Sequence, residues 1–433
     1  MGASVSGGAV VSAGAVVSGG AVISAEAVVS AEAVVSAGVV SAEAVVSGVC
    51  GVRAGTATRY AAPRPVLLIH NVVSVVSYGE SMTRVLAVRS VFPPHVHPQA
   101  EITEALARFM PSGSDTALLR RVHASVRVER RHLALPLERY GPANDFGTTN
   151  ALFVEKALEL GAHALELALA DAGLAPDELD LVMSTTVTGL ATPSLEARLA
   201  TRAGLRPDVR RVPLFGLGCA AGAAGVGHLH DHLTGRSGHA ALLLSTELCS
   251  LTLQSTDTSM ANLVAGALFG DGAGALLAVG RDHPLHATGA GPEVVAARSR
   301  LYPGTEHLLG WDIGHWGMRM VLGRELPDLV RMHVAEEVET FLAAHDLKPA
   351  DVDAWICHPG GPKILDALSD ALALPEQAFA ASRRSLAAVG NLSSASVLHI
   401  LDGVQSAGPP PGSVGLMLGF GPGFASELVL LRW

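Results

Sequence analysis

Pro213-Leu214-Phe215-Gly216-Leu217-Gly218-Cys219-Ala220-Ala221-Gly222 is the stretch of this chain that says most about its chemistry. A short apolar run reaches two glycines, and a cysteine then opens a run of small residues. Glycine tolerates backbone angles that other residues avoid, so the stretch predicts a strand, a sharp turn and a helix that begins near Cys219. A helix N-terminus favours a thiolate, so we expect a lowered pKa and a reactive nucleophile. The alternative is a buried, inert cysteine.

Apolar runs and helical patterns alternate on both sides of this stretch. Continuous apolar strands between helices are typical of largely parallel sheets that are covered on both faces. The sequence therefore predicts an α/β fold of two successive halves, with mixed, largely parallel sheets sandwiched by helices. The predicted strands are residues 84–90, 180–186, 211–217, 240–245, 354–357, 415–418 and 426–431, and the predicted helices are residues 150–173, 194–203, 220–233, 328–345, 363–371 and 396–402.

Composition narrows the class of protein. The chain has 433 residues, is 49% hydrophobic and carries a formal net charge of −10. It has no long Lys/Arg run, so no nucleic-acid partner is expected. Its four cysteines lack CxxC spacing, which argues against a zinc site or a disulfide framework and fits a cytoplasmic location. No apolar run reaches the roughly 18 residues that a membrane-spanning helix needs. His228, His230 and His232 share one predicted helix without a third ligand on its face, so no metal site is expected.

Residues 9–49 repeat the unit Ala-Val-Val-Ser-Ala-Gly/Glu with a period of about six residues. We predict that residues 1–81 are a low-complexity extension and disordered. A parallel β-helix is the alternative, although the repeat would supply only about two coils. A further alternative is that translation starts at Met82, where ordinary globular sequence begins.

Two later motifs supply the partners that a catalytic cysteine needs. They are Ile356-Cys357-His358-Pro359-Gly360-Gly361-Pro362 and Gly390-Asn391-Leu392-Ser393-Ser394. A thiolate can hold an acyl group, and two hydrogen-bond donors can stabilise an enolate oxygen. Cys219, His358 and Asn391 together therefore predict a carbon–carbon bond-forming condensing enzyme. Taken alone, Asn391 is as readily explained as a helix N-cap.

With Ala267-Leu268-Phe269-Gly270-Asp271-Gly272 and Gly419-Phe420-Gly421-Pro422-Gly423, five motifs occur in one order. They make residues 82–433 resemble the type III polyketide synthases, the chalcone-synthase-like branch of the thiolase superfamily. The resemblance implies a thiolase-like fold, with one half at residues 82–285 carrying the cysteine and the other at residues 286–433 carrying His358 and Asn391. It also implies a homodimer that acts on malonyl-CoA and acyl-CoA. CoA thioesters would be substrates, and no cofactor is expected.

The resemblance also assigns roles to residues. Cys219 would accept the starter acyl group, and a positively charged His358 would stabilise its thiolate. His358 and Asn391 would hold the malonyl thioester during decarboxylation. Phe269 would be the gatekeeping aromatic side chain, and the loop with Gly421 would shape the cyclisation cavity. The stretch Arg120-Arg121-Val122-His123, with Arg121 foremost, and Lys363 would bind CoA phosphates, unless they are ordinary surface charges.

The expected starter rests on four further positions. Thr188, Thr192 and Cys249 match positions that line an acyl-binding tunnel in long-chain-accepting bacterial members. Tetrahydroxynaphthalene synthases carry a cysteine at the Thr192 position, and plant chalcone synthases carry a phenylalanine at Met320. We therefore expect a fatty acyl starter and an alkylpyrone or alkylresorcinol product. The alternatives are a 1,3,6,8-tetrahydroxynaphthalene synthase that uses malonyl-CoA only, an enzyme like ketoacyl-ACP synthase III, and a non-catalytic scaffold.

Overall fold

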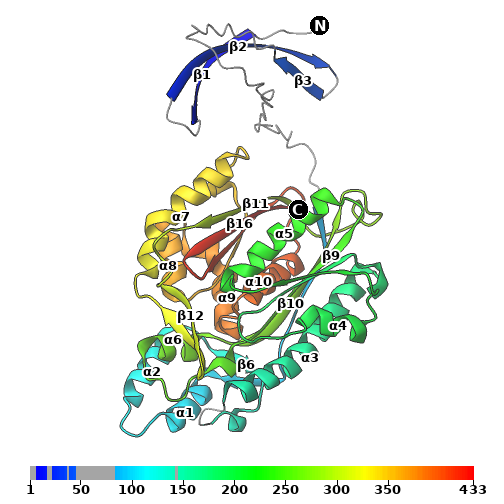
Figure 1. The fold of residues 1–433 in the computed structure, drawn as a ribbon. Coiled ribbons are helices and arrows are strands. Elements are labelled where there is room, and N and C mark those ends of the chain that lie inside the picture. The colour runs from blue at the N-terminus through cyan, green and yellow to red at the C-terminus, as the bar shows by residue number, and fades with distance from the viewer. Residues whose placement is uncertain (1–5, 17–21, 37–38, 45–82, 142–144) are drawn as a thin grey trace, which may run out of the picture. The chain divides into compact units, whose positions relative to one another are not determined.

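The computed structural model describes residues 6–16, 22–36, 39–44, 83–141 and 145–433 (Figure 1). The chain divides into two units, Met1–Val76 and Ser77–Trp433. In the first unit, strands β1 (Ser6–Val16), β2 (Val22–Ser36) and β3 (Val39–Ala44) pair antiparallel. These segments are therefore extended, and their pairing differs from the parallel β-helix alternative. The predicted disorder of the other residues in 1–81, and the predicted start at Met82, lie outside the described residues.

The second unit is built on a nine-stranded mixed sheet with the order β14-β15-β16-β11-β4-β10-β9-β7-β8. The two halves of the chain meet where β4 pairs with β11 through residues 83–84 and 293–294. The predicted boundary at residues 285/286 falls in the connection between β10 and β11 and stays a prediction. The strands of the first half are β4 (Thr83–Val91), β7 (Leu181–Thr185), β8 (Arg210–Leu214), β9 (Ala240–Leu248) and β10 (Asp271–Gly280), and those of the second are β11 (Glu293–Leu301), β14 (Ala354–Cys357), β15 (Val414–Gly421) and β16 (Ala425–Arg432).

The α/β class and the mixed sheet are confirmed, but the expectation that the sheets are largely parallel was wrong. Among the strand pairs that the structure describes, only β7–β8, β7–β9 and β14–β15 are parallel. The pairs that involve β10 or β11 and the hairpin β15–β16 are antiparallel. Strands β10 and β11 were not predicted, and a tight turn such as the one between β15 and β16 forces antiparallel pairing.

Helices cover the two half-sheets and also separate them (Figure 1). On the outer side of the first half, Leu165 of α3 (Phe146–Ala172) shares a core with Leu242 and Leu244 of β9. The intervening Leu243 points the other way, into a central core with Val226 and Val397. These two residues belong to α5 (Ala221–Gly235) and α10 (Ala395–Ser406), which lie between the half-sheets. Because both faces of these strands are buried, their sequences are continuous apolar runs.

The remaining elements complete the outer layers and one end of the unit. Helices α7 (Leu326–Ala343) and α8 (Pro362–Ala371) share a core with β14, β15 and β16. Helix α6 (Met260–Leu268) contacts α2 and the hairpin β12–β13. None of the described helices combines the length and apolar character that crossing a membrane requires. The other elements are α1 (Gln99–Phe109), α2 (Thr116–Ser125), α4 (Leu195–Ala203), α9 (Ala380–Val389), β5 (His95–Pro98), β6 (Arg130–Leu133), β12 (Leu309–Gly314) and β13 (Gly317–Leu322).

Candidate active site

The strand–turn–helix predicted around Cys219 is present. Strand β8 ends at Leu214, and Cys219 lies in a single 3-10 turn, Gly218–Ala220, that leads into α5. Gly218 has a φ of +51°, a conformation that favours glycine. A Cβ at this position would also stand only 2.4 Å from Cδ of Pro422. The turn therefore needs glycine both for its backbone angle and for its contact with the β15–β16 loop.

His358 and Asn391 reach the same site from the second half. His358 directly follows β14 and anchors its backbone by donating a 2.8 Å hydrogen bond to Leu418 O. Asn391 follows α9 and pairs with the segment after α6, since its N–H donates to Leu268 O at 2.8 Å. Both side chains are buried, with His358 3% and Asn391 2% exposed. Asn391 Nδ2 lies 3.4 Å from His358 Nε2, so the structure brings these two predicted residues into contact.

Ser393 connects this pair to the cysteine. The thiol of Cys219 donates to Ser393 Oγ across 3.4 Å, and the backbone N–H of Ser393 donates to Asn391 Oδ1 at 2.8 Å. Because Oδ1 accepts that bond, the Asn391 amide must turn its NH₂ toward His358. Among the described residues, no hydrogen bond joins Cys219 directly to His358. Sequence reasoning quoted Ser393 within a motif without giving it a role, although it stands only two residues after Asn391.

Burial sets the protonation states of this site. It raises the pKa of the Cys219 thiol to about 12, against a smaller opposite effect of the Ser393 hydrogen bond. It lowers the pKa of His358 to about 3. The lowered cysteine pKa expected from the helix N-terminus was therefore wrong, because loss of hydration outweighs the local field. Burial therefore works against the ion pair that we expected between Cys219 and His358.

A buried carboxyl group lies behind the cysteine. Glu247 in β9 accepts hydrogen bonds from Thr188 Oγ1 at 2.9 Å and Thr186 Oγ1 at 3.1 Å. It also accepts one from the hydroxyl of Ser394, next to Ser393. Burial raises the pKa of Glu247, and its charge opposes ionisation of Cys219. Sequence reasoning treated Glu247 as a structural residue, and no local pattern marks its contacts with chain segments about 60 and 147 residues away.

The cysteine opens into a hollow of about 400 Å³. Three of the predicted substrate-binding residues, Thr188, Cys249 and Phe269, line it together with Cys219. Phe269 directly follows α6, where its carbonyl accepts a 2.7 Å hydrogen bond from the buried Arg131. The opposite wall comes from the hairpin β12–β13, whose paired residues Trp311 and Met320 both face the hollow. The other lining residues are Val187, Gly218, Leu309, Gly310, Ser393 and Pro422.

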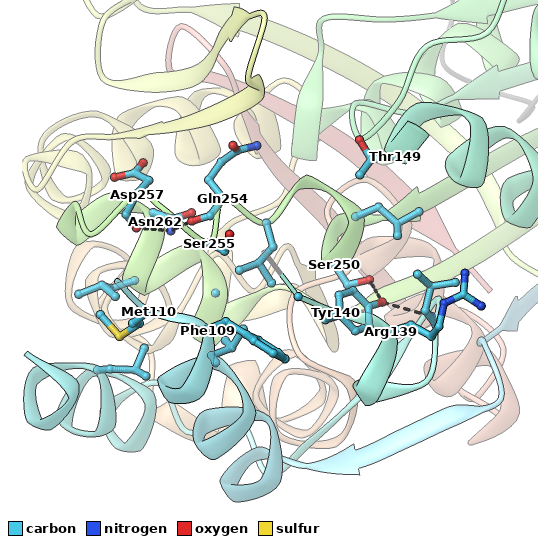
Figure 2. A pocket seen from close by; sticks show the side chains of 18 of the residues that line it. Phe109, Met110, Arg139, Tyr140, Thr149, Ser250, Gln254, Ser255, Asp257 and Asn262 are labelled. Atoms are coloured by element: carbon cyan, nitrogen blue, oxygen red, sulfur yellow. Dashed lines mark hydrogen bonds between the residues drawn. The ribbon is translucent and has the colours of Figure 1, made fainter. Parts of the chain in front are cut away.

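Two more hollows continue from the first. One of about 330 Å³ shares Cys249, Phe269, Trp311 and Met320 with it. The next, of about 950 Å³ including space open to solvent, lies among α1, α2 and α6 (Figure 2). Figure 2 shows Met110 on one side of this cavity and Tyr140, hydrogen bonded to Ser250, on the other. These spaces form a series that leads from Cys219 toward α1 and α2.

Gly421 has a different place from the predicted one. It does not line the hollow, and a Cβ at this position would stand 2.5 Å from Leu217 O and 2.7 Å from Cβ of Ala220. Glycine is needed there because β15 passes directly beneath the Cys219 turn. Gly421 therefore supports the Cys219 turn, and Pro422 is the residue of this loop that reaches the hollow.

Thr192 does not join the site within the protomer. It is exposed, and its carbonyl accepts a 3.2 Å hydrogen bond from Arg198 Nη2 on the surface. It lines none of the three hollows described above. The loop after β7 turns outward before it reaches this residue, and the tunnel position expected for Thr192 stays a prediction.

The expected phosphate-binding residues lie mainly on the surface. Arg121 is exposed and stands 3.9 Å from Asp115, and Lys363 is exposed at the start of α8. Arg120 pairs with Glu104 of α1. His123 from the same stretch is buried and faces inward, so it does not fit a phosphate site.

The described residues contain no group of three or more His, Cys, Asp or Glu side chains that would hold a metal ion. His232 Nε2 lies 3.2 Å from His239 Nδ1, and His230 Nδ1 lies 3.0 Å from Thr83 Oγ1. His230 and His232 of α5 are thus engaged with neighbouring side chains.

Comparison with known proteins places both halves of the chain. A family model for the N-terminal domain of chalcone and stilbene synthases matches residues 71–283, and one for the C-terminal domain matches residues 293–433. A 1,3,6,8-tetrahydroxynaphthalene synthase of Streptomyces peucetius subsp. caesius is 54% identical, over 81% of this chain and 93% of its own length. Another from Streptomyces coelicolor is 32% identical, over 79% of this chain and 90% of its own length. The crystal structure of the Streptomyces coelicolor A3(2) enzyme, described as a bacterial type III polyketide synthase, superposes with a TM-score of 0.76 at 31% identity. That superposition covers 81% of this chain and 99% of that one.

Proposed function

Since this chain belongs to the chalcone and stilbene synthase family and is a type III polyketide synthase, we propose that Cys219, His358 and Asn391 carry its condensation chemistry. Enzymes of this class join acyl units from CoA thioesters with loss of CO₂. The observation that carries the proposal is the orientation of Asn391. Ser393 N–H holds its Oδ1, so Nδ2 faces His358 at the site that also contains Cys219.

The first step loads the cysteine. As Cys219 Sγ attacks the carbonyl carbon of an acyl-CoA, its proton moves to the neutral His358, so both charges form together and stabilise each other. The carbon–sulfur bond to CoA breaks, and the departing thiolate takes the proton back from the imidazolium. Burial disfavours either charge alone, which supports a proton transfer during attack over a standing thiolate.

The second step makes the new carbon–carbon bond. His358 Nε2 and Asn391 Nδ2 stand 3.4 Å apart, a spacing that lets two N–H donors share one thioester oxygen of malonyl-CoA. Loss of CO₂ leaves an enolate whose negative oxygen these donors stabilise. The enolate carbon attacks the acyl carbonyl on Cys219, a carbon–carbon bond forms, and Cys219 leaves as a thiolate that takes a proton from solvent. CoA thioesters serve as the substrates, and the proposal needs no further cofactor.

For the product, we propose an aromatic polyketide made from malonyl-CoA alone. Relatives at 54% and 32% identity are named 1,3,6,8-tetrahydroxynaphthalene synthases, and a naphthalene skeleton contains ten carbons, or five two-carbon units. Thr192, one of the positions on which the expected fatty acyl starter rests, lies outside the hollow of the single chain. One observation still favours the fatty acyl alternative, namely the series of spaces that leads from Cys219 into a cavity of about 950 Å³.

Incubation of the purified full chain with malonyl-CoA, alone and with acyl-CoA esters of increasing length, tests this proposal. Mass spectrometry of the products should find a ten-carbon aromatic compound from malonyl-CoA alone. A product that appears only with a long acyl starter would overturn the malonyl-only assignment in favour of the alternative. If neither CO₂ release nor a new carbon–carbon bond is found with any starter, the catalytic proposal itself is overturned.

The proposal includes a homodimer. Strand β8 is the outer edge of the sheet, and Val212 and Phe215 beside it are 36% and 50% exposed. An uncovered edge with exposed apolar side chains invites pairing with a second copy. Light scattering of the eluted protein should give the dimer mass, and Phe215→Asp should shift it toward the monomer. Leu301→Asp, at an exposed position on β11, is the matched control.

The three described cysteines are free thiols, which supports the proposed cytoplasmic location.

A further inference from the structure

One buried arginine takes no part in the chemistry above. Arg131 of β6 is 1% exposed. Among the described residues its guanidinium donates to two neutral acceptors, Gln99 Oε1 at 3.0 Å and Phe269 O at 2.7 Å, and its Nη2 is buried without a partner. Burial lowers the pKa of Arg131 to about 10, against the opposite effect of the nearby Asp271 carboxylate, so the group is charged at neutral pH. A buried charge that neutral groups hold costs stability, which is typical of residues that serve a functional site.

Arg131 completes a set of three donors at the end of α6. A helix leaves its last carbonyl groups without partners inside the helix. The carbonyl groups of residues 267–269 accept, in that order, from Gln99 Nε2 at 2.9 Å, the Asn391 N–H at 2.8 Å and Arg131 Nη1 at 2.7 Å. A positive charge also suits this end of a helix, where the helix dipole is negative. The three donors therefore fix the point at which α6 passes into Phe269.

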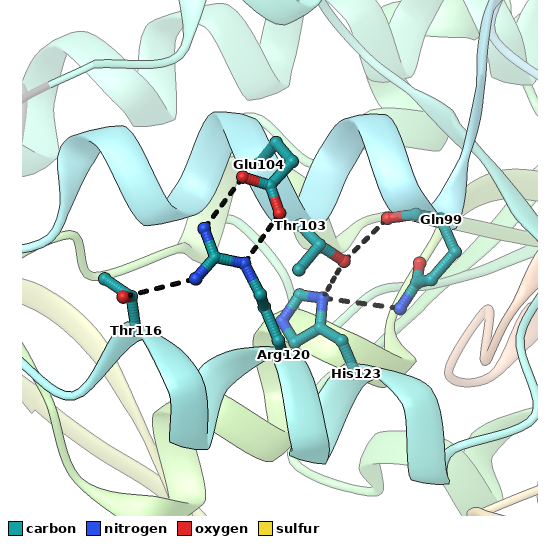
Figure 3. Close-up of polar contacts among 6 residues, drawn as sticks. All are labelled: Gln99, Thr103, Glu104, Thr116, Arg120 and His123. Carbon is teal, nitrogen blue, oxygen red and sulfur yellow. Dashed lines mark hydrogen bonds and ion pairs between the residues drawn. The ribbon is translucent and has the colours of Figure 1, made fainter.

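Gln99 is itself held, and this sets the direction of its amide. Figure 3 shows Gln99 beside Thr103 and His123. Its backbone carbonyl accepts from Thr103 Oγ1 at 2.7 Å, and its Nε2 lies 3.5 Å from His123 Nδ1. Because Nε2 donates to Ala267 O, Oε1 faces Arg131 and orients the guanidinium.

These hydrogen bonds hold the backbone that carries the Phe269 ring. The N–H of Phe269 donates to Ala265 O at 3.1 Å, and its carbonyl accepts from Arg131. The ring lines both the hollow beside Cys219 and the intermediate hollow of about 330 Å³. Since the peptide groups on both sides of Phe269 are held, only side-chain rotation among staggered positions remains. The direction of the backbone thus decides whether the ring stands between the two hollows.

We propose that Arg131 is a positioning residue, which holds the Phe269 ring between the two hollows and so limits the size of a group that reaches Cys219. Gln99 orients Arg131 for this task. The effect on access to Cys219 follows from the packing alone. An effect on the length of the polyketide rests on the proposed function.

Alkylation of Cys219 by two maleimides of different size tests the proposal without catalysis. N-methylmaleimide and N-(1-pyrenyl)maleimide add to a thiol by the same reaction, so the ratio of their rates cancels changes in the thiol pKa and in the folded fraction. Mass spectrometry of the Cys219 peptide gives both rates in the full chain. Arg131→Met removes the charge and the hydrogen bonds but keeps an unbranched stem beside Gly390, whose Cβ would stand 3.2 Å from Arg131 Cγ. The ratio of the pyrenyl rate to the methyl rate should rise about five- to tenfold. An unchanged ratio would overturn the proposal.

Two comparisons separate positioning from a general loosening of the fold. Arg84→Met is the matched control, because Arg84 is half-buried, pairs with Glu293 and lines none of the three hollows. It should leave the ratio at the parent value, and an equal rise there would contradict a specific role of Arg131. Phe269→Ala should raise the ratio by itself, and Arg131→Met should then add nothing. Equal rises from Arg131→Met in both backgrounds would show that Arg131 does not act through the ring.

Gln99→Leu keeps the test decisive if Arg131→Met fails to fold. It leaves the guanidinium in place but removes the acceptor that orients it and the donor to Ala267 O. The ratio should rise in the same direction, about two- to threefold, because the hydrogen bond to Phe269 O weakens without its guide. A ratio that stays at the parent value would contradict the arrangement of donors described above.

Products formed from malonyl-CoA extend the test to synthesis. Arg131→Met should change the distribution of product lengths, while CO₂ release stays within about twofold of the parent rate, because backbone hydrogen bonds still hold Asn391. Unchanged product lengths beside a raised alkylation ratio would overturn the link to chain length. A parent protein without any turnover would refute the proposed function, and the alkylation result would still decide the role of Arg131.

Discussion

Ser393 Oγ stands 3.4 Å from Cys219 Sγ, although the two residues are 174 positions apart in the chain. The same residue holds the Asn391 amide through its backbone N–H at 2.8 Å. Its side chain and its backbone therefore serve different members of the site. A substitution that removes only the hydroxyl separates the two roles.

Ser393→Ala should slow acylation of Cys219 about five- to tenfold, because one hydrogen bond to the thiol is worth about 1 kcal/mol. The hydrogen bond lowers the pKa of Cys219, so its loss should also move the pH dependence of thiol alkylation to higher pH. Decarboxylation of malonyl-CoA should stay close to the original rate, since the backbone N–H of Ser393 still orients Asn391. Alkylation and acylation rates from mass spectrometry check this. A larger loss of decarboxylation than of acylation would contradict it.

Cys219→Ala should abolish polyketide formation and leave slow malonyl-CoA decarboxylation, because His358 and Asn391 remain in contact without the cysteine. Trapping the acyl-enzyme and digesting it should locate the acyl group on Cys219. Cys249 and Cys357 serve as internal controls, because both are buried thiols in the folded protein. Their peptides can be examined for an acyl group in the same digest. An adduct on either of them in place of Cys219 would refute the assignment.

Stability should fall as the pH falls below neutrality, in part because of His358. Its pKa in the folded protein is about 3, below its ordinary value of 6.5, so the unfolded chain binds more protons between those values. The contribution is complete above pH 6.5 and is lost on acidification, with a slope of about 1.4 kcal/mol per pH unit. Denaturant unfolding at several pH values should give a shallower slope for His358→Asn. Equal slopes in the variant and the parent protein would show that the histidine is not buried in its neutral form.

Gly222→Ala should destabilise the protein by about 1–3 kcal/mol, because the central helices leave no room for a methyl group. A Cβ there would stand 2.2 Å from Ser394 O and 2.6 Å from Val397 Cγ2. The contact lies between α5 and α10, so activity should fall together with stability. Gly235→Ala in the same helix is the control, since its Cβ would meet nothing within 4 Å and should be neutral or slightly stabilising. Thermal unfolding of the two variants compares them directly.

The sequence alone predicted the helices, strands and turns that depend on local residue patterns. The turn at Cys219, the strand Ala354–Cys357 and the helix Ala221–Gly235 follow from apolar runs, glycines and small residues, and all three are present. The strand Asp271–Gly280 was missed because its glycines and alanines resemble a turn. The strand Glu293–Leu301 was missed because it mixes charged with apolar residues. Without these two, the antiparallel centre of the sheet was not predictable.

The site was predictable in identity but not in electrostatics. Cys219, His358 and Asn391 could be chosen from motifs, and the structure gathers them. The directions of the pKa shifts of Cys219 and His358 could not be predicted, because the burial of both side chains depends on packing between the two halves. Thr192 shows the same limit, since a residue four positions after Val187-Thr188, which line the hollow, is already exposed. Ser393 and Glu247 needed three-dimensional neighbours before a role was visible.

Cys219, the proposed nucleophile, lies on one half of the chain, and His358 and Asn391, which we propose to polarise its substrate, lie on the other. A ribosome-bound chain therefore completes the N-terminal half well before any reaction centre exists. Chemistry becomes available only when the last strands dock, so an incomplete chain neither consumes malonyl-CoA nor holds a stranded acyl group.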